Sequence, residues 1–326
     1  MIISRTPLRM SFFGGGSDLK EYYKTGYGSV LSTSIDKYIY MTVNTKFSDK
    51  IRICYSKTES VSDIKQIKHN LVREALRVVG INQGGLDIVY MSDMLPDHEG
   101  SGLGASSSLT VGILHALFTF KGQKVSIEKL ASLACNIEID VLGHPIGKQD
   151  QYAAAFGGFN RINFNADETV DVIPLNLNKK TIKNLNQNII CFHIGKNTRS
   201  DTILDEQTKN THLNISEIDK MISFVDDGIE LLKNSRLNDF GDLLDMSWNI
   251  KKGLATNISN SDIDKAYSMA KDAGARGGKI LGSGGGGFLM FFCETKYQDI
   301  LRNKLGYLKE ADLKFSSGGS QIIYDG

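Results

Sequence analysis

Glycine is concentrated at three places in this chain of 326 residues: positions 14–16, positions 100, 102 and 104, and positions 282 and 284–287. Glycine adopts positive φ and lets the backbone come close to a ligand, so several N–H groups can converge on one anion. Loops of this kind commonly hold phosphates, although any one cluster alone is equally compatible with a tight turn. A fold for this chain must therefore place three irregular glycine loops between its regular elements.

The middle cluster lies between an expected strand over residues 86–95 and an expected helix over residues 106–120. The first turns of this helix contain Ser106, Ser107 and Ser108, and no acidic side chain follows before Glu128. The N–H groups and the positive end of the helix dipole would therefore face a site for an anion. Because a structural N-cap needs one hydroxyl rather than three, we favour a phosphate site, where a hydroxyl can also bind a metal ion.

Two glycine strings match the dinucleotide-binding pattern, one starting at Gly100 and one at Gly282, but neither has the context of that motif. The first has Lys124 rather than an acid about twenty residues further on, and the second joins two expected strands. The P-loop pattern is absent. A nicotinamide-dependent dehydrogenase is therefore a weaker alternative, which predicts NADH binding.

Short strands and helices are mixed along the chain without strict alternation, which favours an α+β fold over a doubly wound sheet. The length and an Asn- and Lys-rich change of composition indicate two domains, residues 1–175 and 176–326. We expect helices at residues 69–79, 106–120, 126–143 and 297–305, and further helices between 200 and 273. We expect strands at residues 2–13, 29–45, 50–56, 86–95, 159–164, 189–194 and 312–324, and a strand–loop–strand at 278–292.

Charge and cysteine content argue against several classes of protein. Lys and Arg total 38 against 37 for Asp and Glu, so the formal net charge is +1, whereas a nucleic-acid-binding protein usually has a basic excess. The four cysteines are far apart, which indicates neither a disulfide framework nor a zinc site. The longest mostly apolar stretch, residues 109–120, is too short to span a bilayer. We expect a cytoplasmic protein with no nucleic acid or membrane partner.

Three segments, in this order, resemble the three motifs of the GHMP kinases: PLRMSFFGGGSD (residues 7–18), GSGLGASSS (100–108) and KILGSGGGGF (279–288). The segment GKQDQYAAAFGG (147–158) is similar as well. The resemblance covers nearly the whole chain and implies the two-domain GHMP kinase fold, with a ribosomal protein S5 domain 2-like N-terminal domain and a ferredoxin-like C-terminal domain. It also implies a kinase that uses ATP and Mg²⁺.

Within this family the first motif is most similar to the sugar-1-kinase branch, which includes kinases of L-fucose and of D-glycero-D-manno-heptose 7-phosphate. The segments IDKYIYMTV (35–43) and GKQDQYAAAFGGFNRI (147–162) resemble the heptose 7-phosphate kinases. This implies phosphorylation of the anomeric hydroxyl to give the 1,7-bisphosphate, for GDP-heptose and surface polysaccharide biosynthesis, by a monomer or homodimer. L-fucose or another sugar is the alternative acceptor, and a catalytically inactive ligand- or RNA-binding relative is the alternative outside enzymes.

The resemblance implies that the middle glycine loop holds the phosphates of ATP. It also implies that Ser106 and Glu138 bind Mg²⁺. In the expected helix Glu138 lies along an apolar face, where a carboxylate needs a partner because an unpaired buried charge is costly. The alternative is an acid at the rim of that face, paired with a lysine. The expected ATP-binding residues are Gly100, Ser101, Gly102, Leu103, Gly104, Ala105, Ser106 and Ser107.

Asp150 matches the acceptor-activating aspartate of the family. It lies near the start of a short Ala-rich helix, where the dipole favours the ionised carboxylate, and it is implied to orient and deprotonate the sugar hydroxyl. Arg9 matches the basic residue of the first motif. Since an arginine cannot act as a base near neutral pH, we expect it to stabilise Asp150 and the charge on the transferred phosphoryl group. Without the resemblance, Asp150 is a helix cap and Arg9 an exposed strand residue.

The first glycine cluster is expected on the sugar side, where Asp18 can accept two sugar hydroxyl donors. The third cluster is expected to close the site from the second domain. An acceptor with a 7-phosphate needs a basic partner, for which Arg199, Arg276, Lys148 and Lys279 are candidates. The expected substrate-binding residues are Gly15, Gly16, Ser17, Asp18, Lys148, Gly284 and Gly285.

Overall fold

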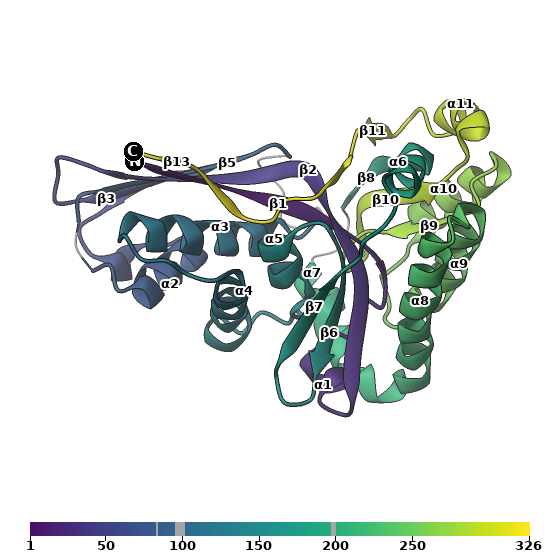
Figure 1. The fold of residues 1–326 in the computed structure, drawn as a ribbon, viewed down its shortest axis with the longest axis horizontal. Coiled ribbons are helices and arrows are strands. Elements are labelled where there is room, and N and C mark those ends of the chain that lie inside the picture. Colours follow the sequence, from purple (N-terminus) through teal and green to yellow (C-terminus); the bar gives the residue numbers. More distant parts are fainter. Residues whose placement is uncertain (83, 95–101, 197–199) are drawn as a thin grey trace.

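The computed structural model describes residues 1–82, 84–94, 102–196 and 200–326, and their strands form two sheets (Figure 1). The larger sheet has nine strands and contains the order β13-β1-β2-β5-β3-β4. The smaller sheet has four strands in the order β11-β8-β10-β9. Strands and helices are mixed in both halves of the chain, which confirms the expected α+β class.

The larger sheet is built around two long antiparallel strands, β1 (Ile2–Phe13) and β2 (Tyr27–Thr45). The first part of β2 pairs with β6 and its last part with β5, while β12 pairs between them. Most strands are antiparallel, but β3 pairs with β5 in parallel. The other strands of this sheet are β3 (Ile51–Cys54), β4 (Thr58–Val61), β5 (Leu86–Ser92), β6 (Phe159–Asn165), β7 (Val170–Pro174), β12 (Phe315–Ser316) and β13 (Gln321–Asp325).

Four helices cover one face of the larger sheet: α2 (Asn70–Val79), α3 (Ala105–Phe120), α4 (Ile127–Cys135) and α5 (Gln149–Phe156) (Figure 1). Helix α3 packs directly on β1 and β2, and most of it is buried because, after its first turn, its sequence is mainly apolar. Gly112 allows this close approach, since a Cβ there would lie 2.9 Å from Thr6 Oγ1. The start of α3 is therefore fixed against the end of β1, where the site lies.

The second half of the chain packs helices against the smaller sheet (Figure 1). Its strands are β8 (Ile189–Lys196), β9 (Gly277–Ile280), β10 (Gly286–Phe292) and β11 (Lys309–Ala311). Its helices are α6 (Lys179–Asn188), α7 (Ser200–Lys209), α8 (Ile215–Lys233), α9 (Leu237–Lys251), α10 (Ser261–Asp272) and α11 (Thr295–Lys304). Short helical turns are formed by α1 (Lys20–Tyr23), Ile64–Gln66 and Thr211–Leu213.

The two halves share a hydrophobic core at the end of β1. The rings of Phe12 and Phe13 both make edge contacts with Phe240 of α9, at centroid distances of 5.4 and 5.1 Å. All three side chains are fully buried. Gly228 of α8 leaves room for the Phe13 ring, because a Cβ there would lie 2.6 Å from it. Burial of three aromatic side chains fixes the second half against the strand that carries Arg9.

Three sequence-based expectations differ from the structure. The expectation of a single strand over residues 312–324 is wrong. This segment forms two strands, β12 and β13, because Gly318 and Gly319 between them pass close to the backbone at the end of α5. The Asn- and Lys-rich segment, for which no helix was expected, forms α6. The helix after Ser126 changes at Asn136 to a π-helical turn, Asn136–Val141.

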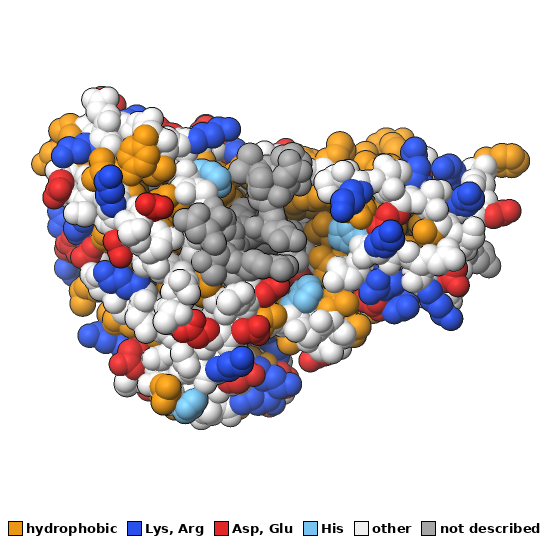
Figure 2. Space-filling view, turned by 180° about the vertical axis from the view of Figure 1, so that it is seen from behind, with side chains coloured by type: hydrophobic (Ala, Val, Ile, Leu, Met, Phe, Trp, Pro, Cys, Tyr) orange, Lys and Arg blue, Asp and Glu red, His pale blue; other side chains and the backbone are white. Residues whose placement is uncertain are grey.

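The division of the chain near residue 175 stays a prediction. Residue 175 falls between β7 and α6. The end of the chain nevertheless returns to the larger sheet, since β13 pairs with β1 and the two termini lie side by side (Figure 1). Acidic and basic side chains are interspersed over the face drawn in Figure 2, as the balanced charge leads one to expect.

Candidate active site

The second and third glycine clusters meet by direct backbone contact. A Cβ on Gly102 would lie 2.1 Å from the carbonyl oxygen of Leu281, and a Cβ on Gly282 would lie 2.5 Å from the Cα of Gly102. Only glycine fits at these two positions, and both have positive φ. The loop between β9 and β10 therefore lies on the loop that precedes α3. Gly100 and Ser101, expected in the same phosphate loop, lie outside the described residues.

The N-terminus of α3 points into this junction without a side-chain cap. Gly104 precedes the helix with φ +74, and Ala105, Ser106 and Ser107 form its first turn. A backbone hydrogen bond joins this loop to β1: the Leu103 carbonyl accepts from the N–H of Arg9 at 3.0 Å. The uncapped N–H groups of a 16-residue helix form a site suited to phosphate oxygens.

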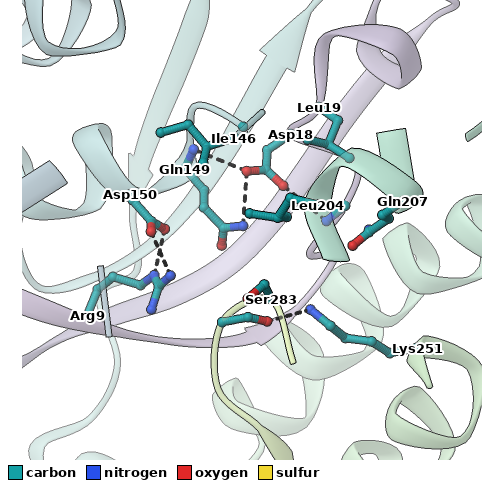
Figure 3. Close-up of a pocket in the computed structure, with 13 residues that line it drawn as sticks. Arg9, Asp18, Leu19, Ile146, Gln149, Asp150, Leu204, Gln207, Lys251 and Ser283 are labelled. Carbon is teal, nitrogen blue, oxygen red and sulfur yellow. Dashed lines mark hydrogen bonds and ion pairs between the residues drawn. The ribbon is translucent and has the colours of Figure 1, made fainter. Parts of the chain in front are cut away.

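Arg9 and Asp150 form a two-point ion pair beside this helix. Arg9 Nε and Nη2 donate to the two carboxylate oxygens of Asp150, both at 2.7 Å, and Arg9 Nη1 donates to the Gly102 carbonyl at 2.6 Å. Arg9 is 4% exposed and the Asp150 side chain 22%, so the alternative of Arg9 as an exposed strand residue is wrong. Asp150 lies in the first turn of α5, with its carboxylate toward a cavity (Figure 3). The guanidinium thus joins the glycine loop to the carboxylate.

Glu138 is fully buried and faces the start of α3. Its Oε1 accepts from the Ser106 hydroxyl and its Oε2 from Gln151 Nε2, both at 2.7 Å. Burial raises the pKa of this carboxyl to about 6. Among the described residues Glu138 forms no ion pair, so the alternative of an acid at the rim paired with a lysine does not hold.

The Glu138 and Ser106 pair fits a divalent cation. Mg²⁺ typically takes one or two protein oxygens and completes its shell with phosphate oxygens and water. A buried carboxylate without a cationic partner, hydrogen-bonded to a hydroxyl at the mouth of the phosphate loop, provides such oxygens. The π-helical turn at 136–141 directs Glu138 inward, a use that π turns often have at functional sites.

Asp18 and Gln149 form a second polar pair at the same cavity (Figure 3). Asp18 Oδ2 accepts from Gln149 Nε2 at 3.0 Å, and Oδ1 accepts from the Gly16 N–H at 3.0 Å. Burial raises the pKa of the Asp18 carboxyl above its ordinary value. Gly147 allows the chain to pass, since a Cβ there would lie 2.0 Å from Asp18 Oδ2. The Oε1 atom of Gln149 is buried and has no hydrogen-bond partner among the described residues.

The other expected substrate-binding residues do not line the cavity. The Ser17 hydroxyl is buried within hydrogen-bonding distance of the Gly14 carbonyl, at 2.7 Å, and of the Ser29 carbonyl, at 3.0 Å, so it shapes the first loop. The Lys148 ammonium contacts Glu168 and lies over the Tyr23 ring, away from Asp150. Gly284 packs against Ile258, Gly285 donates to the Ile258 carbonyl, and Gly15 lies close to Lys251.

Sequence reasoning missed four polar residues that line the cavity with Arg9, Asp18 and Asp150: Gln149, Gln207, Lys251 and Ser283. Gln149 lies beside Asp150 within a motif that was recognised, so its position was the available signal. Gln207 and Lys251 are contributed by α7 and α9 of the second half, where no local pattern marks them (Figure 3).

The site combines a glycine-lined helix N-terminus, a buried Glu138 bonded to the Ser106 hydroxyl, and an arginine-held aspartate at the adjoining cavity. This set of groups is the kind that phosphoryl transfer needs. The family model for the GHMP kinases N terminal domain matches residues 69–158, and that for the GHMP kinases C terminal matches residues 229–308. A D-glycero-alpha-D-manno-heptose 7-phosphate kinase from Campylobacter jejuni is 32% identical over 98% of this chain and 97% of its own.

Two further comparisons agree with these matches. The crystal structure of a D-glycero-D-manno-heptose 1-phosphate kinase from Bacteroides thetaiotaomicron covers all of both chains with a TM-score of 0.83 and 26% identity. The bifunctional fucokinase/GDP-fucose pyrophosphorylase of Arabidopsis thaliana is 25% identical over 94% of this chain, which spans 31% of that longer protein.

The chain belongs to the GHMP kinase family. It is therefore an ATP-using sugar kinase, a phosphotransferase with an alcohol group as acceptor. The expected family, fold and enzyme class are confirmed, and the dehydrogenase and the non-catalytic relative are set aside. No helix within the described residues is both long enough and apolar enough to cross a membrane.

Proposed function

We propose that this kinase transfers the γ-phosphoryl group of ATP to the anomeric hydroxyl of D-glycero-D-manno-heptose 7-phosphate, which gives the 1,7-bisphosphate and ADP. Support for this acceptor comes from the Campylobacter jejuni relative, whose similarity extends over nearly the full length of both chains. We place the enzyme in the cytoplasm, in the synthesis of GDP-heptose for surface polysaccharide.

The observation that carries the proposal is the Arg9–Asp150 ion pair. In the proposed reaction an Asp150 oxygen accepts the proton of the anomeric hydroxyl. The anomeric oxygen of the sugar then forms a bond to the γ-phosphorus as the bond between that phosphorus and the bridging oxygen of ADP breaks. Arg9 holds the Asp150 carboxylate in place through two hydrogen bonds, and it adds positive charge beside the transferred group.

The nucleotide phosphates would lie at the N-terminus of α3, against the N–H groups from Gly102 to Ser107. Ser106 and Glu138 would hold Mg²⁺, which neutralises the phosphate charge that develops in the transfer. The acceptor would lie in the cavity between the halves, with its hydroxyls at Asp18 and Gln149. With the ligands in these positions, Asp150 would lie between the phosphates and the sugar.

The acceptor is tested by measuring ADP release with a panel of sugars, each with and without a terminal phosphate. We expect turnover with heptose 7-phosphate and a much lower kcat/KM with heptose, L-fucose and galactose. Higher kcat/KM with L-fucose than with heptose 7-phosphate would instead favour the neutral-sugar alternative.

The assigned base is tested in Asp150→Asn. Asparagine keeps the volume and an acceptor for Arg9, whereas alanine would leave a buried guanidinium unpaired. We expect kcat to fall by between about 10²- and 10⁴-fold while ATP binding, measured by calorimetry, is retained. Unchanged turnover in Asp150→Asn would overturn the assignment.

A further inference from the structure

Lys251 lies where the three glycine clusters meet. It is the last residue of α9 and is 6% exposed, and it lines the cavity with Asp18 and Asp150 (Figure 3). Its Nζ donates to the Gly282 carbonyl at 2.9 Å, and a Cβ on Gly15 would lie 3.5 Å from the same nitrogen. Since Gly282 contacts Gly102, the ammonium is close to all three loops at once.

Three of the four basic residues expected to bind the acceptor phosphate have other partners. Arg276 pairs with Asp242, with Nη2 and Oδ2 2.6 Å apart, and Lys148 contacts Glu168. Lys279 is 2% exposed and donates to the Phe12 carbonyl at 3.0 Å. None of these three lines the cavity, and Arg199 lies outside the described residues.

The Lys251 ammonium can donate further hydrogen bonds into the cavity. It has three N–H donors, and within the described residues one is used, by the Gly282 carbonyl. The other cation of the cavity, Arg9, is neutralised by Asp150 through two hydrogen bonds. An ammonium buried with one hydrogen bond is costly unless an anion joins it. An anionic ligand with several oxygens would therefore satisfy both the charge and the remaining N–H donors of Lys251.

We propose that Lys251 is a phosphate-binding residue of this site and contacts a phosphate group of the reacting complex directly. This proposal rests on the proposed function in taking ATP and a sugar phosphate as the ligands present. A lysine suits the task because its compact charge and rotatable donors match phosphate oxygens. The phosphate belongs either to the acceptor or to the γ-position of ATP, and the two sources have separate signatures.

Burial also lowers the pKa of Lys251 to about 8. The charged groups that face it are Asp18 and Asp150, which favour the ammonium, and Arg9, which disfavours it. The buried Lys279 also interacts with it, since the Lys251 charge contributes to lowering the pKa of Lys279. A phosphate bound to the ammonium form therefore makes kcat/KM fall as pH rises through about 8 in the wild-type enzyme. An arginine, which stays protonated, would remove this fall.

The test compares Lys251→Met, Lys251→Arg and the control Lys252→Met, which alters the exposed neighbour. The kcat and KM are measured for heptose 7-phosphate, for unphosphorylated heptose and for ATP, from pH 6.5 to 9.5. If the acceptor phosphate is the ligand, Lys251→Met raises the KM for heptose 7-phosphate at least tenfold and leaves kcat/KM for heptose unchanged. If the γ-phosphate is the ligand, kcat falls at least a hundredfold with both acceptors. In either case Lys251→Arg recovers activity and loses the fall above pH 8.

Two results would overturn the proposal. One is wild-type kinetics in Lys251→Met. The other is an equal loss in Lys251→Met and Lys251→Arg with an unchanged pH profile, which is the behaviour of a lysine that only supports the Gly282 carbonyl. A wild-type enzyme that phosphorylates neutral sugars alone would contradict the proposed acceptor, but Lys251 would still be tested by the kcat and pH measurements with that sugar and ATP.

Discussion

Arg9 and Asp150 are 141 positions apart in the chain, yet the guanidinium holds both carboxylate oxygens at 2.7 Å. The same guanidinium donates to the Gly102 carbonyl. The strand β1, the phosphate loop and the helix α5 are therefore joined at one side chain. A change in Arg9 should alter the position of Asp150 and of the loop together.

Arg9→Lys should lower kcat by about 100-fold, because a lysine keeps the charge but cannot make the two-point contact and the Gly102 contact at once. Steady-state kinetics measure this effect. Arg52→Lys is the matched control, since Arg52 also donates two hydrogen bonds to one carboxylate, that of Asp87, away from the site. Full kcat in Arg9→Lys would show that the ion pair is not needed for transfer.

Gly104→Ala should lose activity beyond its loss of stability. Gly104 has φ +74, and its Cβ would lie 3.2 Å from Arg9 Cγ and 3.3 Å from Asp150 Oδ2. Gly122→Ala is the control, because Gly122 has φ +67 with nothing within 4 Å. Both variants should lose about 1–2 kcal/mol in denaturant unfolding, and Gly104→Ala alone should lose at least about tenfold in kcat/KM for ATP. Equal activity in the two variants would contradict the role of this close contact.

Glu138→Gln should lower kcat at least about 100-fold, because the amide is a poor ligand for Mg²⁺ and leaves phosphate charge less neutralised. Its fold should survive, since the buried Oε1 of Gln151 has no partner in the described part of the chain and can accept from the new amide. Titration with Mg²⁺ and ATP measures the loss. Unaltered dependence of kcat on Mg²⁺ in Glu138→Gln would remove this residue from the metal site.

The ligand-free wild type should also lose stability with rising pH, relative to Glu138→Gln. Because burial raises the Glu138 pKa to about 6 from 4.5, the folded state holds this proton more tightly than the unfolded state does. The stabilisation is complete below about 4.5 and is lost as pH rises through about 6. The difference in unfolding free energy between the two proteins should therefore change by about 2 kcal/mol between pH 4 and pH 8. A constant difference would contradict this charge burial.

Gln149→Leu should raise the KM for the sugar about tenfold and leave the KM for ATP unchanged. Within the residues that the structure describes, the buried Oε1 of Gln149 has no partner, and its Nε2 donates to Asp18, so the amide oxygen is placed to accept from a sugar hydroxyl. Loss of one such hydrogen bond is worth about 1.4 kcal/mol, which corresponds to a factor of ten. An unchanged sugar KM would assign Gln149 to support of Asp18 alone.

Much of the fold and of the site could be predicted because the determinants are local in the sequence. The apolar run after the serines predicted α3, and short runs of β-branched and aromatic residues predicted β1 and β2. The motif around Asp150 placed that residue at the start of a short helix, which is where α5 begins. These features depend on neighbouring residues and hence can be read along the chain.

The residues that were missed or misplaced depend on contacts between distant segments. Lys148 is two positions from Asp150, but the backbone at the start of α5 directs its ammonium to Glu168. Lys251 and Gln207 reach the cavity because α9 and α7 pack against the first half, which no local spacing reveals. The return of β13 to β1 likewise depends on pairing between the two ends of the chain.

The most direct test of the proposed reaction is ³¹P NMR of a mixture containing wild-type enzyme, ATP, Mg²⁺ and D-glycero-D-manno-heptose 7-phosphate. We expect a new signal from a phosphate on the anomeric carbon, which grows in equal proportion to ADP while the 7-phosphate signal persists, and which does not form with Asp150→Asn. No anomeric phosphate with this acceptor, under conditions in which the same enzyme phosphorylates a neutral sugar, would contradict the proposed reaction.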